Sequence, residues 1–207
     1  METSPNSEPV RIKRPLVWLV LAAWLLVTLV LGAFTTAAHS AALPRPNDGD
    51  ATLGSALIGL RRDPSRPLAV HALYARCKCS QGIVEHLIAR HSDARFEEVV
   101  LLVGDLPQQE RLLAGSGYTV HHVQGAELET RFHIEAAPLL VVTDARGRVQ
   151  YAGGYQKFKG GVSVEQSILD GAASGDALAR LPVLGCAVSK RLRGKIDPLG
   201  LKESGED

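Results

Sequence analysis

One stretch of sequence decides the fold of this chain: LAVHALYARCKCSQ, residues 68–81. Its first half, Leu68 to Tyr74, is almost entirely apolar, which is typical of a strand buried on both faces of a parallel sheet. An amphipathic helix is predicted to begin near Gln81, because the apolar residues beyond it recur at helical spacing. Cys77 and Cys79 therefore lie at the junction between a buried strand and a helix.

The start of a helix favours the ionised form of a cysteine. Unpaired backbone amides and the helix dipole stabilise an anion there, and Arg76 and Lys78 are predicted to reinforce that effect. Because the thiolate is the attacking species in disulfide exchange, the pair is predicted to be redox-active. Cys77 is expected to be the exposed, attacking thiol, and Cys79, further into the helix, is expected to be the resolving thiol.

Only one residue separates the two cysteines, so a disulfide between them must close a small ring. Such a bond is expected to be strained, and strain raises the reduction potential. The sequence therefore favours an oxidising or isomerising couple over a strongly reducing one. Two other interpretations of the pair stay open: a clamp for Cu(I), since soft thiolates suit that ion, and two inert cysteines.

Beyond the cysteines, strand and helix patterns alternate along the chain, as they do in proteins with parallel crossovers. Asp144 to Gly147 is predicted to be a hairpin turn between two antiparallel strands. Ser163 is predicted to cap the last helix, with Gln166 as its capping-box partner. The predicted strands cover residues 68–74, 96–103, 118–123, 139–143 and 149–152, and the predicted helices cover 52–60, 81–91, 107–114, 127–132 and 164–171.

Toward the N-terminus, Leu16 to Phe34 forms an uncharged apolar run that is long enough to span a bilayer. Arg11, Lys13 and Arg14 precede it, which predicts a cytoplasmic N-terminus and an exported remainder. A cleaved signal peptide is the competing interpretation, because small residues near Ser40 offer a cleavage site. In a bacterium, both would place the cysteines on the periplasmic side of the inner membrane, where disulfides persist. The predicted segments are a cytoplasmic segment at 1–14, a transmembrane anchor at 15–38, a tether at 39–51, a globular domain at 52–195 and a disordered tail at 196–207.

The order of elements over residues 68–175 resembles that of thioredoxin. Redox cysteines at a helix start are followed by further strand and helix units, a proline-led strand, a hairpin and a final helix. The stretch FHIEAAPLLVVTD, residues 132–144, resembles the cis-proline strand of that family. The resemblance implies a central mixed sheet flanked by helices and a cis bond before Pro138. It also implies that Ala137 and Pro138 bind the backbone of a partner chain.

The site departs from the common pattern of that family. The Trp-Cys-Gly-Pro-Cys sequence is absent, since Arg76 precedes Cys77 and Lys78 alone separates the thiols. The C-x-C site, the Gly153-Gly154 pair and the late Gly185-Cys186 resemble membrane-anchored thioredoxin-like proteins labelled RedB. That narrower resemblance implies no particular substrate.

A third cysteine, Cys186, lies beyond the part of the chain that resembles thioredoxin. It could resolve a mixed disulfide made by Cys77 or Cys79, complete a three-thiolate copper site with them, or pair with another chain. It could also be a small buried hydrophobe. His71, in the first strand, is predicted to be a half-buried, satisfied histidine rather than a metal ligand.

The sequence thus predicts an α/β, thioredoxin-like domain preceded by one N-terminal transmembrane helix. Its predicted activity is that of a thiol–disulfide oxidoreductase or isomerase on exported proteins that carry thiols or disulfides, with no cofactor. A Cu(I) metallochaperone or assembly factor using Cys77, Cys79 and Cys186 is the alternative, and a non-catalytic adaptor is a third possibility. The net charge of +1 gives no reason to expect binding to nucleic acid.

Overall fold

The computed structural model describes residues 14–40, 42–46, 51–158 and 160–197, and its contacts divide the chain into two units, 1–41 and 42–207. In the first unit, helix α1 spans Arg14–Ser40. Within the described part of the chain, no helix combines the length and apolar character that crossing a membrane requires. The anchor predicted over 15–38 finds no support in that result. Parts of three predicted segments lie outside the described residues. These are residues 1–13 of the cytoplasmic segment, residues 41 and 47–50 of the tether, and residues 198–207 of the tail.

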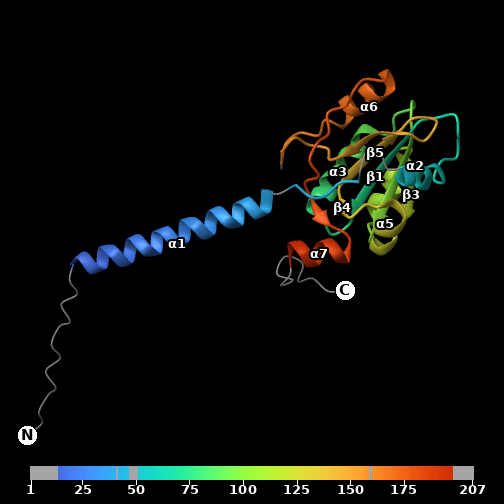
Figure 1. The fold of residues 1–207 in the computed structure, drawn as a ribbon. Helices are drawn as coiled ribbons and strands as arrows, with labels where there is room; N and C mark the ends of the chain where they lie inside the picture. The colour runs from blue at the N-terminus through green and yellow to red at the C-terminus, as the bar shows by residue number, and fades with distance from the viewer. Residues whose placement is uncertain (1–13, 41, 47–50, 159, 198–207) are drawn as a thin grey trace, which may run out of the picture. The chain divides into compact units, whose positions relative to one another are not determined.

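The second unit is built on a five-stranded mixed sheet with the strand order β3-β2-β1-β5-β6 (Figure 1). Strand β1, Leu68–Tyr74, pairs in parallel with β2, Glu97–Val103, and antiparallel with β5, Leu139–Thr143. At the two edges, β3, Thr119–His122, runs parallel to β2, and β6, Val149–Gly153, runs antiparallel to β5. The apolar run that predicts β1 is therefore the central strand, and all seven of its residues are buried.

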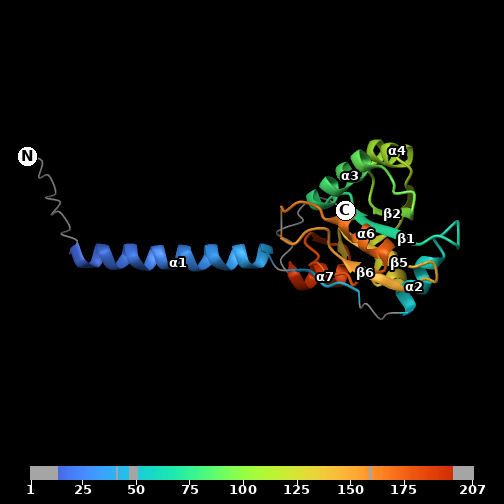
Figure 2. The ribbon, with the colours of Figure 1, turned by 90° about the horizontal axis from the view of Figure 1, so that it is seen from above.

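Helices cover both faces of this sheet (Figure 2). Successive side chains of a strand point to opposite faces. Val70 and Ala72 of β1 therefore pack into one core with α2, α5 and α7, and Ala69 and Leu73 pack into the other core with α3, α4 and α6. The bounds of these helices are Ala51–Ile58 for α2, Lys78–Arg90 for α3, Pro107–Gly115 for α4, Gly125–Phe132 for α5, Glu165–Ser174 for α6 and Lys190–Ile196 for α7.

Helix α3 begins at Lys78, three residues before the predicted start at Gln81. Cys77 is its N-cap residue and has an extended backbone, with φ −91° and ψ 115°. The Gln81 amide donates to the Cys77 carbonyl at 3.0 Å, which closes the first turn. The prediction placed the start too late because it relied on apolar periodicity, and the first turn is polar. Consequently Cys79 belongs to the helix itself.

Two predicted connections are confirmed. The bond between Ala137 and Pro138 is cis, as the resemblance implies. The turn at Asp144 to Gly147 joins β5 to β6, and the Asp144 carboxylate accepts hydrogen bonds from the Arg146 and Arg148 amides at 2.8 and 2.9 Å. These short connections fix the proline at one end of β5 and the hairpin at the other.

The predicted N-cap position of helix α6 is wrong by one residue. Val164, not Ser163, is the N-cap residue of α6, and the Ser163 hydroxyl accepts from the Glu165 amide at 3.4 Å. Gln166 donates instead to Asp93 and Asp170, at 3.3 and 3.2 Å. The capping-box pattern is present in the sequence, but the side-chain amide of Gln166 is used to join α6 to the segment before β2.

Two short elements follow α6 that the sequence did not predict. Strand β7, Cys186–Ala187, pairs antiparallel with β4, Ala136–Ala137, in a separate two-stranded sheet. Helix α7 comes directly after it, and Ser189 caps that helix by accepting from the Leu192 amide at 3.0 Å. This arrangement brings the third cysteine to the residue that precedes the cis-proline.

Candidate redox site

Cys77 occupies a fixed position at the carboxyl end of the central strand. Its amide donates to the Tyr74 carbonyl at 3.0 Å, which turns the chain out of β1. The Ser80 hydroxyl accepts from the Tyr74 amide at 3.1 Å, and the Gln81 side chain donates to the Ala75 carbonyl at 2.8 Å. These bonds tie the first turn of α3 to the end of β1, so the two cysteines are held by regular structure on both sides.

The three cysteines of the chain come together around Cys77. None of the three forms a disulfide. The Cys77 sulfur lies 3.8 Å from the Ala137 carbonyl oxygen and shares hydrogen bonds with the side chains of both Cys186 and Cys79. Two of the roles that the sequence left open for Cys186 require a contact with Cys77, and the structure has that contact.

The pKa of the Cys77 thiol lies far below its ordinary value. Hydrogen bonding from Cys186 makes the largest contribution, and hydrogen bonding from Cys79 makes the next. Burial acts in the opposite direction, while the Ser80 and Cys79 amides at the start of α3 lower the pKa further. Both neighbouring thiols therefore favour the ionised form of Cys77.

The predicted helpers of the thiolate contribute less than expected. Arg76 and Lys78 are both exposed side chains. The leading contributions to the low pKa of Cys77 come from thiols and amides rather than from these two cations. Direct hydrogen bonds outweigh exposed charges because water screens a charge at the surface.

The exposure of the two cysteines is the reverse of the predicted order. Cys77 is 0% exposed, whereas Cys79 is half-buried and lines a surface pocket. The prediction assumed that the residue nearer the helix start faces solvent, but β4 and β7 cover that position. Cys79 is therefore the more accessible of the two thiols.

Ala137 and Pro138, predicted to bind a partner chain, have separate surroundings. Ala137 is fully buried, and its backbone is opposite Cys186 in the β4–β7 pair. The chain's own strand thus occupies the edge that the resemblance assigns to a partner. Pro138, in contrast, lines the pocket beside Cys79. The structure brings both residues to the cysteines but leaves only Pro138 facing an open space.

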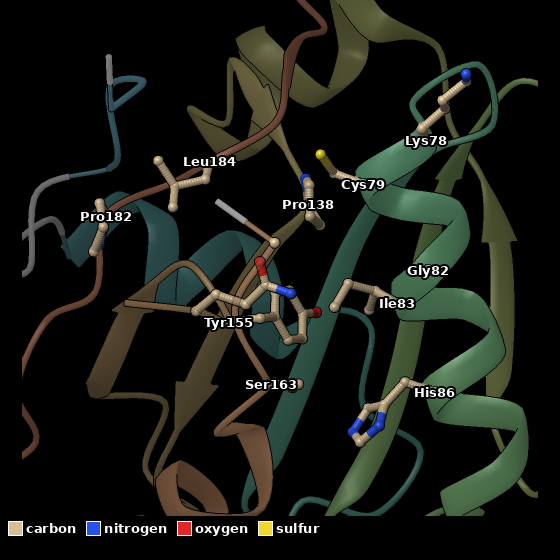
Figure 3. A pocket seen from close by; sticks show the side chains of 12 residues that line it. Lys78, Cys79, Gly82, Ile83, His86, Pro138, Tyr155, Ser163, Pro182 and Leu184 are labelled. Atoms are coloured by element: carbon tan, nitrogen blue, oxygen red, sulfur yellow. The ribbon is translucent and has the colours of Figure 1, made fainter. Parts of the chain in front are cut away.

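The pocket next to Cys79 has a volume of about 480 Å³ and runs along α3. Figure 3 shows the Cys79 sulfur directed toward Pro138 at one end and His86 lower on the same helix. Ile83 and Leu184 supply apolar walls, and Tyr155 lies between the two ends. The space suits a side chain or a short peptide segment that carries a sulfur to Cys79.

A buried charge cluster lies behind this pocket. His71 Nε2 is 2.8 Å from Glu98 Oε2, and its Nδ1 is 2.9 Å from the Tyr155 hydroxyl. The Arg90 guanidinium lies 2.6 Å from Glu98 and 2.8 Å from Glu165, so a cation already bridges both carboxylates. His71 is thus satisfied, as predicted, although it is fully buried rather than half-buried.

With His71 on β1, this cluster ties four elements of the second core together. Glu98 comes from β2, Arg90 from α3 and Glu165 from α6, and Glu165 also lies 3.0 Å from Nε2 of His86, which lines the pocket. The roles of Glu165 and Tyr155 were not predicted from the sequence. Two glutamates at the start of a strand predicted to be buried, Glu97 and Glu98, could have indicated such a cluster, because a buried charge needs a partner.

The geometry bears on the predicted copper site. In the described part of the chain, one group of three histidine, cysteine or acidic residues has ligand atoms that all lie within 4.8 Å of one another, namely His71, Glu98 and Glu165. The three cysteines do not form such a group. Their sulfurs form a chain with Cys77 in the middle, which suits exchange between neighbours better than a shared ion.

The fold and the site together define an α/β domain with a mixed five-stranded sheet and a cysteine cluster at a helix start. No protein-family model and no curated protein matches the chain. An uncharacterized conserved protein from Geobacillus kaustophilus is similar in structure, with a TM-score of 0.48, 15% identity and coverage of 60% of this chain and 77% of that one. A hypothetical protein from Sinorhizobium meliloti 1021 has a TM-score of 0.49, 18% identity and coverage of 72% and 91%.

Proposed function

We propose that the protein is a thioredoxin-like thiol–disulfide oxidoreductase that acts on exported proteins. The observation that carries this proposal is the contact of the buried Cys77 sulfur with the Cys79 thiol, at a helix start that lowers the pKa of Cys77. A sulfur that ionises easily is a good leaving group in disulfide exchange. Cys79, which faces the pocket, is the thiol that meets the substrate.

The reaction runs in two exchanges. In the oxidised protein Cys77 and Cys79 share a disulfide, and a substrate thiolate attacks the Cys79 sulfur, so that Cys77 leaves as a thiolate. A second substrate thiolate then attacks the substrate sulfur of the mixed disulfide and releases Cys79. The substrate gains one disulfide, and the protein gains two electrons and two protons. Every step is an exchange at sulfur, so no cofactor takes part.

The low pKa of Cys77 also favours one direction. Stabilising the thiolate stabilises the reduced protein, which makes the couple more oxidising. We therefore expect a reduction potential well above the value of about −270 mV that is typical of thioredoxin. Equilibration with glutathione buffers of known ratio, followed by alkylation and mass measurement, gives this potential. A value at or below about −270 mV would contradict the proposed direction.

Two single variants test the roles of the cysteines. Cys77→Ser leaves Cys79 able to attack a substrate disulfide but removes the thiol that resolves the product, so mixed disulfides at Cys79 should accumulate. Cys79→Ser should abolish exchange with protein substrates, because the remaining Cys77 is buried. A non-reducing gel after acid quenching distinguishes the two. If mixed disulfides accumulated in Cys79→Ser and exchange were lost in Cys77→Ser, Cys77 would be the attacking thiol and Cys79 the resolving thiol, as predicted from sequence.

The rival functions have their own outcomes. Stoichiometric copper in protein purified without oxygen would overturn the proposal in favour of metal handling. Full activity in cells of a variant that lacks both Cys77 and Cys79 would overturn it in favour of an adaptor. A gel-based exchange assay with a scrambled disulfide protein as substrate, compared with the double variant, completes this test.

We also propose that the domain acts outside the cytoplasm. This location rests on the apolar sequence of residues 16–34 and on the basic residues before it. Protease added to intact spheroplasts should then digest residues 42–197 while a cytoplasmic marker survives. The mass of the recovered full chain distinguishes an anchor from a cleaved signal peptide. Protection of the domain until the membrane is lysed would refute the location.

A further inference from the structure

Strand β7 places Cys186 beside the redox pair. In the β4–β7 pair, Ala136 is opposite Ala187 and Ala137 is opposite Cys186. The Cys77 sulfur lies 3.8 Å from the carbonyl oxygen of that same Ala137 and contacts the Cys186 side chain. Cys186 is half-buried, whereas most of its neighbours in this core are buried completely. The register of a two-residue strand therefore decides which group meets Cys77.

Several interactions hold β7 in this register. The Val188 amide donates to the Glu135 carbonyl at 2.7 Å, and the Ser189 hydroxyl donates to the Glu135 carboxylate at 3.0 Å. Upstream of β7, Val183 forms an isolated antiparallel β-bridge with Leu43. The Leu43 amide donates to the Val183 carbonyl at 2.8 Å. Because bonds on both sides of Cys186 fix the backbone, its contact with Cys77 is a built feature of the fold.

The order of the three sulfurs matters for their chemistry. Cys77 contacts both other thiols, but the three sulfurs do not all lie within 4.8 Å of one another. Cys79 and Cys186 thus approach the same sulfur from separate elements, α3 and β7. Disulfide exchange requires an attacking, a central and a leaving sulfur. The structure supplies all three, with Cys77 as the centre.

From this geometry we infer that Cys186 is a third redox thiol, and that the protein forms two alternative disulfides, Cys77–Cys79 and Cys77–Cys186, that interconvert. The inference deepens the proposed function and rests on it. In the forward step the Cys186 thiolate attacks the Cys77 sulfur of the Cys77–Cys79 disulfide, the Cys77–Cys186 bond forms, and Cys79 leaves as a thiolate. The proton released by Cys186 passes to Cys79, so no electrons enter or leave the protein.

The exchange has a consequence at the pocket. With the Cys77–Cys79 bond in place, Cys79 is an electrophile that a substrate thiolate attacks. With the Cys77–Cys186 bond in place, Cys79 is a free thiol in the same pocket and attacks a substrate disulfide instead. The relay therefore lets one protein oxidise thiols and rearrange existing disulfides, according to which bond Cys77 holds.

Tryptic mapping of the full chain, purified in detergent and oxidised with one equivalent of diamide, tests the inference. Trypsin cleaves after Arg76 and Lys78, so Cys77 leaves in the dipeptide CK, and Cys186 leaves in LPVLGCAVSK, residues 181–190. Each disulfide therefore has its own linked mass. We expect the wild type to contain both linked peptides after alkylation at low pH.

Three variants give the decisive comparison. Cys79→Ser should place most of Cys77 in the link to Cys186, Cys186→Ser should place most of it in the link to Cys79, and Cys77→Ser should give neither link. Free Cys77 and Cys186 in oxidised Cys79→Ser, beside a complete Cys77–Cys79 bond in Cys186→Ser, would overturn the inference. So would a Cys79–Cys186 link in Cys77→Ser at wild-type yield. Near-ultraviolet circular dichroism confirms that each variant is folded.

The assay separates this inference from the function on which it rests. If the wild type exchanges disulfides with a scrambled protein substrate but never forms the Cys77–Cys186 bond, the relay is wrong and the oxidoreductase stands. If neither exchange nor any Cys77 disulfide is found, the proposed function itself is wrong. Cys186→Ser adds a functional readout, since it should retain thiol oxidation and lose most of the rearrangement of a scrambled substrate.

Discussion

Gly185→Ala is the most direct perturbation of the contact between β7 and the redox pair. A Cβ atom at this position would lie 2.0 Å from the Ala137 carbonyl oxygen and 2.6 Å from Cδ of Pro138. The first distance is 1.4 Å short of the 3.4 Å at which ordinary van der Waals contact begins. Backbone atoms cannot rotate away as a flexible side chain does, so β7 must move off β4.

The size of the effect follows from that displacement. Overpacking of this kind costs about 1–3 kcal/mol of unfolding free energy. Moving β7 also withdraws the Cys186 thiol, which makes the largest contribution to the low pKa of Cys77. We therefore expect a lower urea midpoint and a higher pKa of the Cys77 thiol, because the hydrogen bond that favours its charged form is lost.

Gly194→Ala is the matched control in the same C-terminal segment. Gly194 lies inside α7, and a Cβ atom there meets nothing within 4 Å. Alanine should stabilise this helix by about 0.5–1 kcal/mol and leave the thiols unchanged. Urea unfolding and the ultraviolet absorbance of thiolate as a function of pH, measured on both proteins, give the comparison. If Gly185→Ala matches the control in both, β7 does not position Cys186.

Three further predictions concern the buried charges and the pocket. Burial raises the pKa of Glu98, but hydrogen bonds and charge from His71 and Arg90 outweigh it and lower the pKa to about 2. The resulting stabilisation is present above pH about 4.5 and is lost as pH falls toward 2. Glu98→Gln should lack this acid-dependent loss of about 3 kcal/mol in urea unfolding measured across that pH range. Arg90→Met should cost about 3–5 kcal/mol in the same assay, because it leaves two buried carboxylates without their cation, and a loss below about 1 kcal/mol would mean that the cluster does not stabilise the fold. Gly82 lines the pocket, and a Cβ atom at this position would meet nothing within 4 Å, so Gly82→Trp should slow exchange with protein substrates at least tenfold while Gly82→Ala does not, and equal rates would show that substrates reach Cys79 by another route.

Much of the sheet could be predicted from sequence because strands buried on both faces require long apolar runs. β1 has the predicted bounds, and the predicted 96–103 strand differs from β2 by one residue. Helix α3, which contains Cys79, was expected because its buried residues recur at a period of 3.6. The residues that carry β7 could not be recognised in this way. A two-residue strand has no period, and its partner, Ala137, lies about 50 residues earlier in the chain.

The candidate site shows the same division. The position of Cys77 and Cys79 at a strand-to-helix junction was readable, as was the cis bond before Pro138. The order in which the two cysteines are exposed could not be predicted from sequence. It depends on β4 and β7, which cover Cys77, rather than on the local sequence. The contact between Cys186 and Cys77 depends on the same pairing, which is why the sequence left the role of Cys186 open.

The late position of β7 in the chain sets an order of events during synthesis. Translation proceeds from the N-terminus, so Cys77 and Cys79 leave the ribosome more than 100 residues before Cys186. Until residues 183–189 are made, β7 cannot cover Cys77 and no third thiol competes for it. The first intramolecular disulfide available to the growing chain is therefore Cys77–Cys79, and the choice between two bonds arises only when the chain is nearly complete.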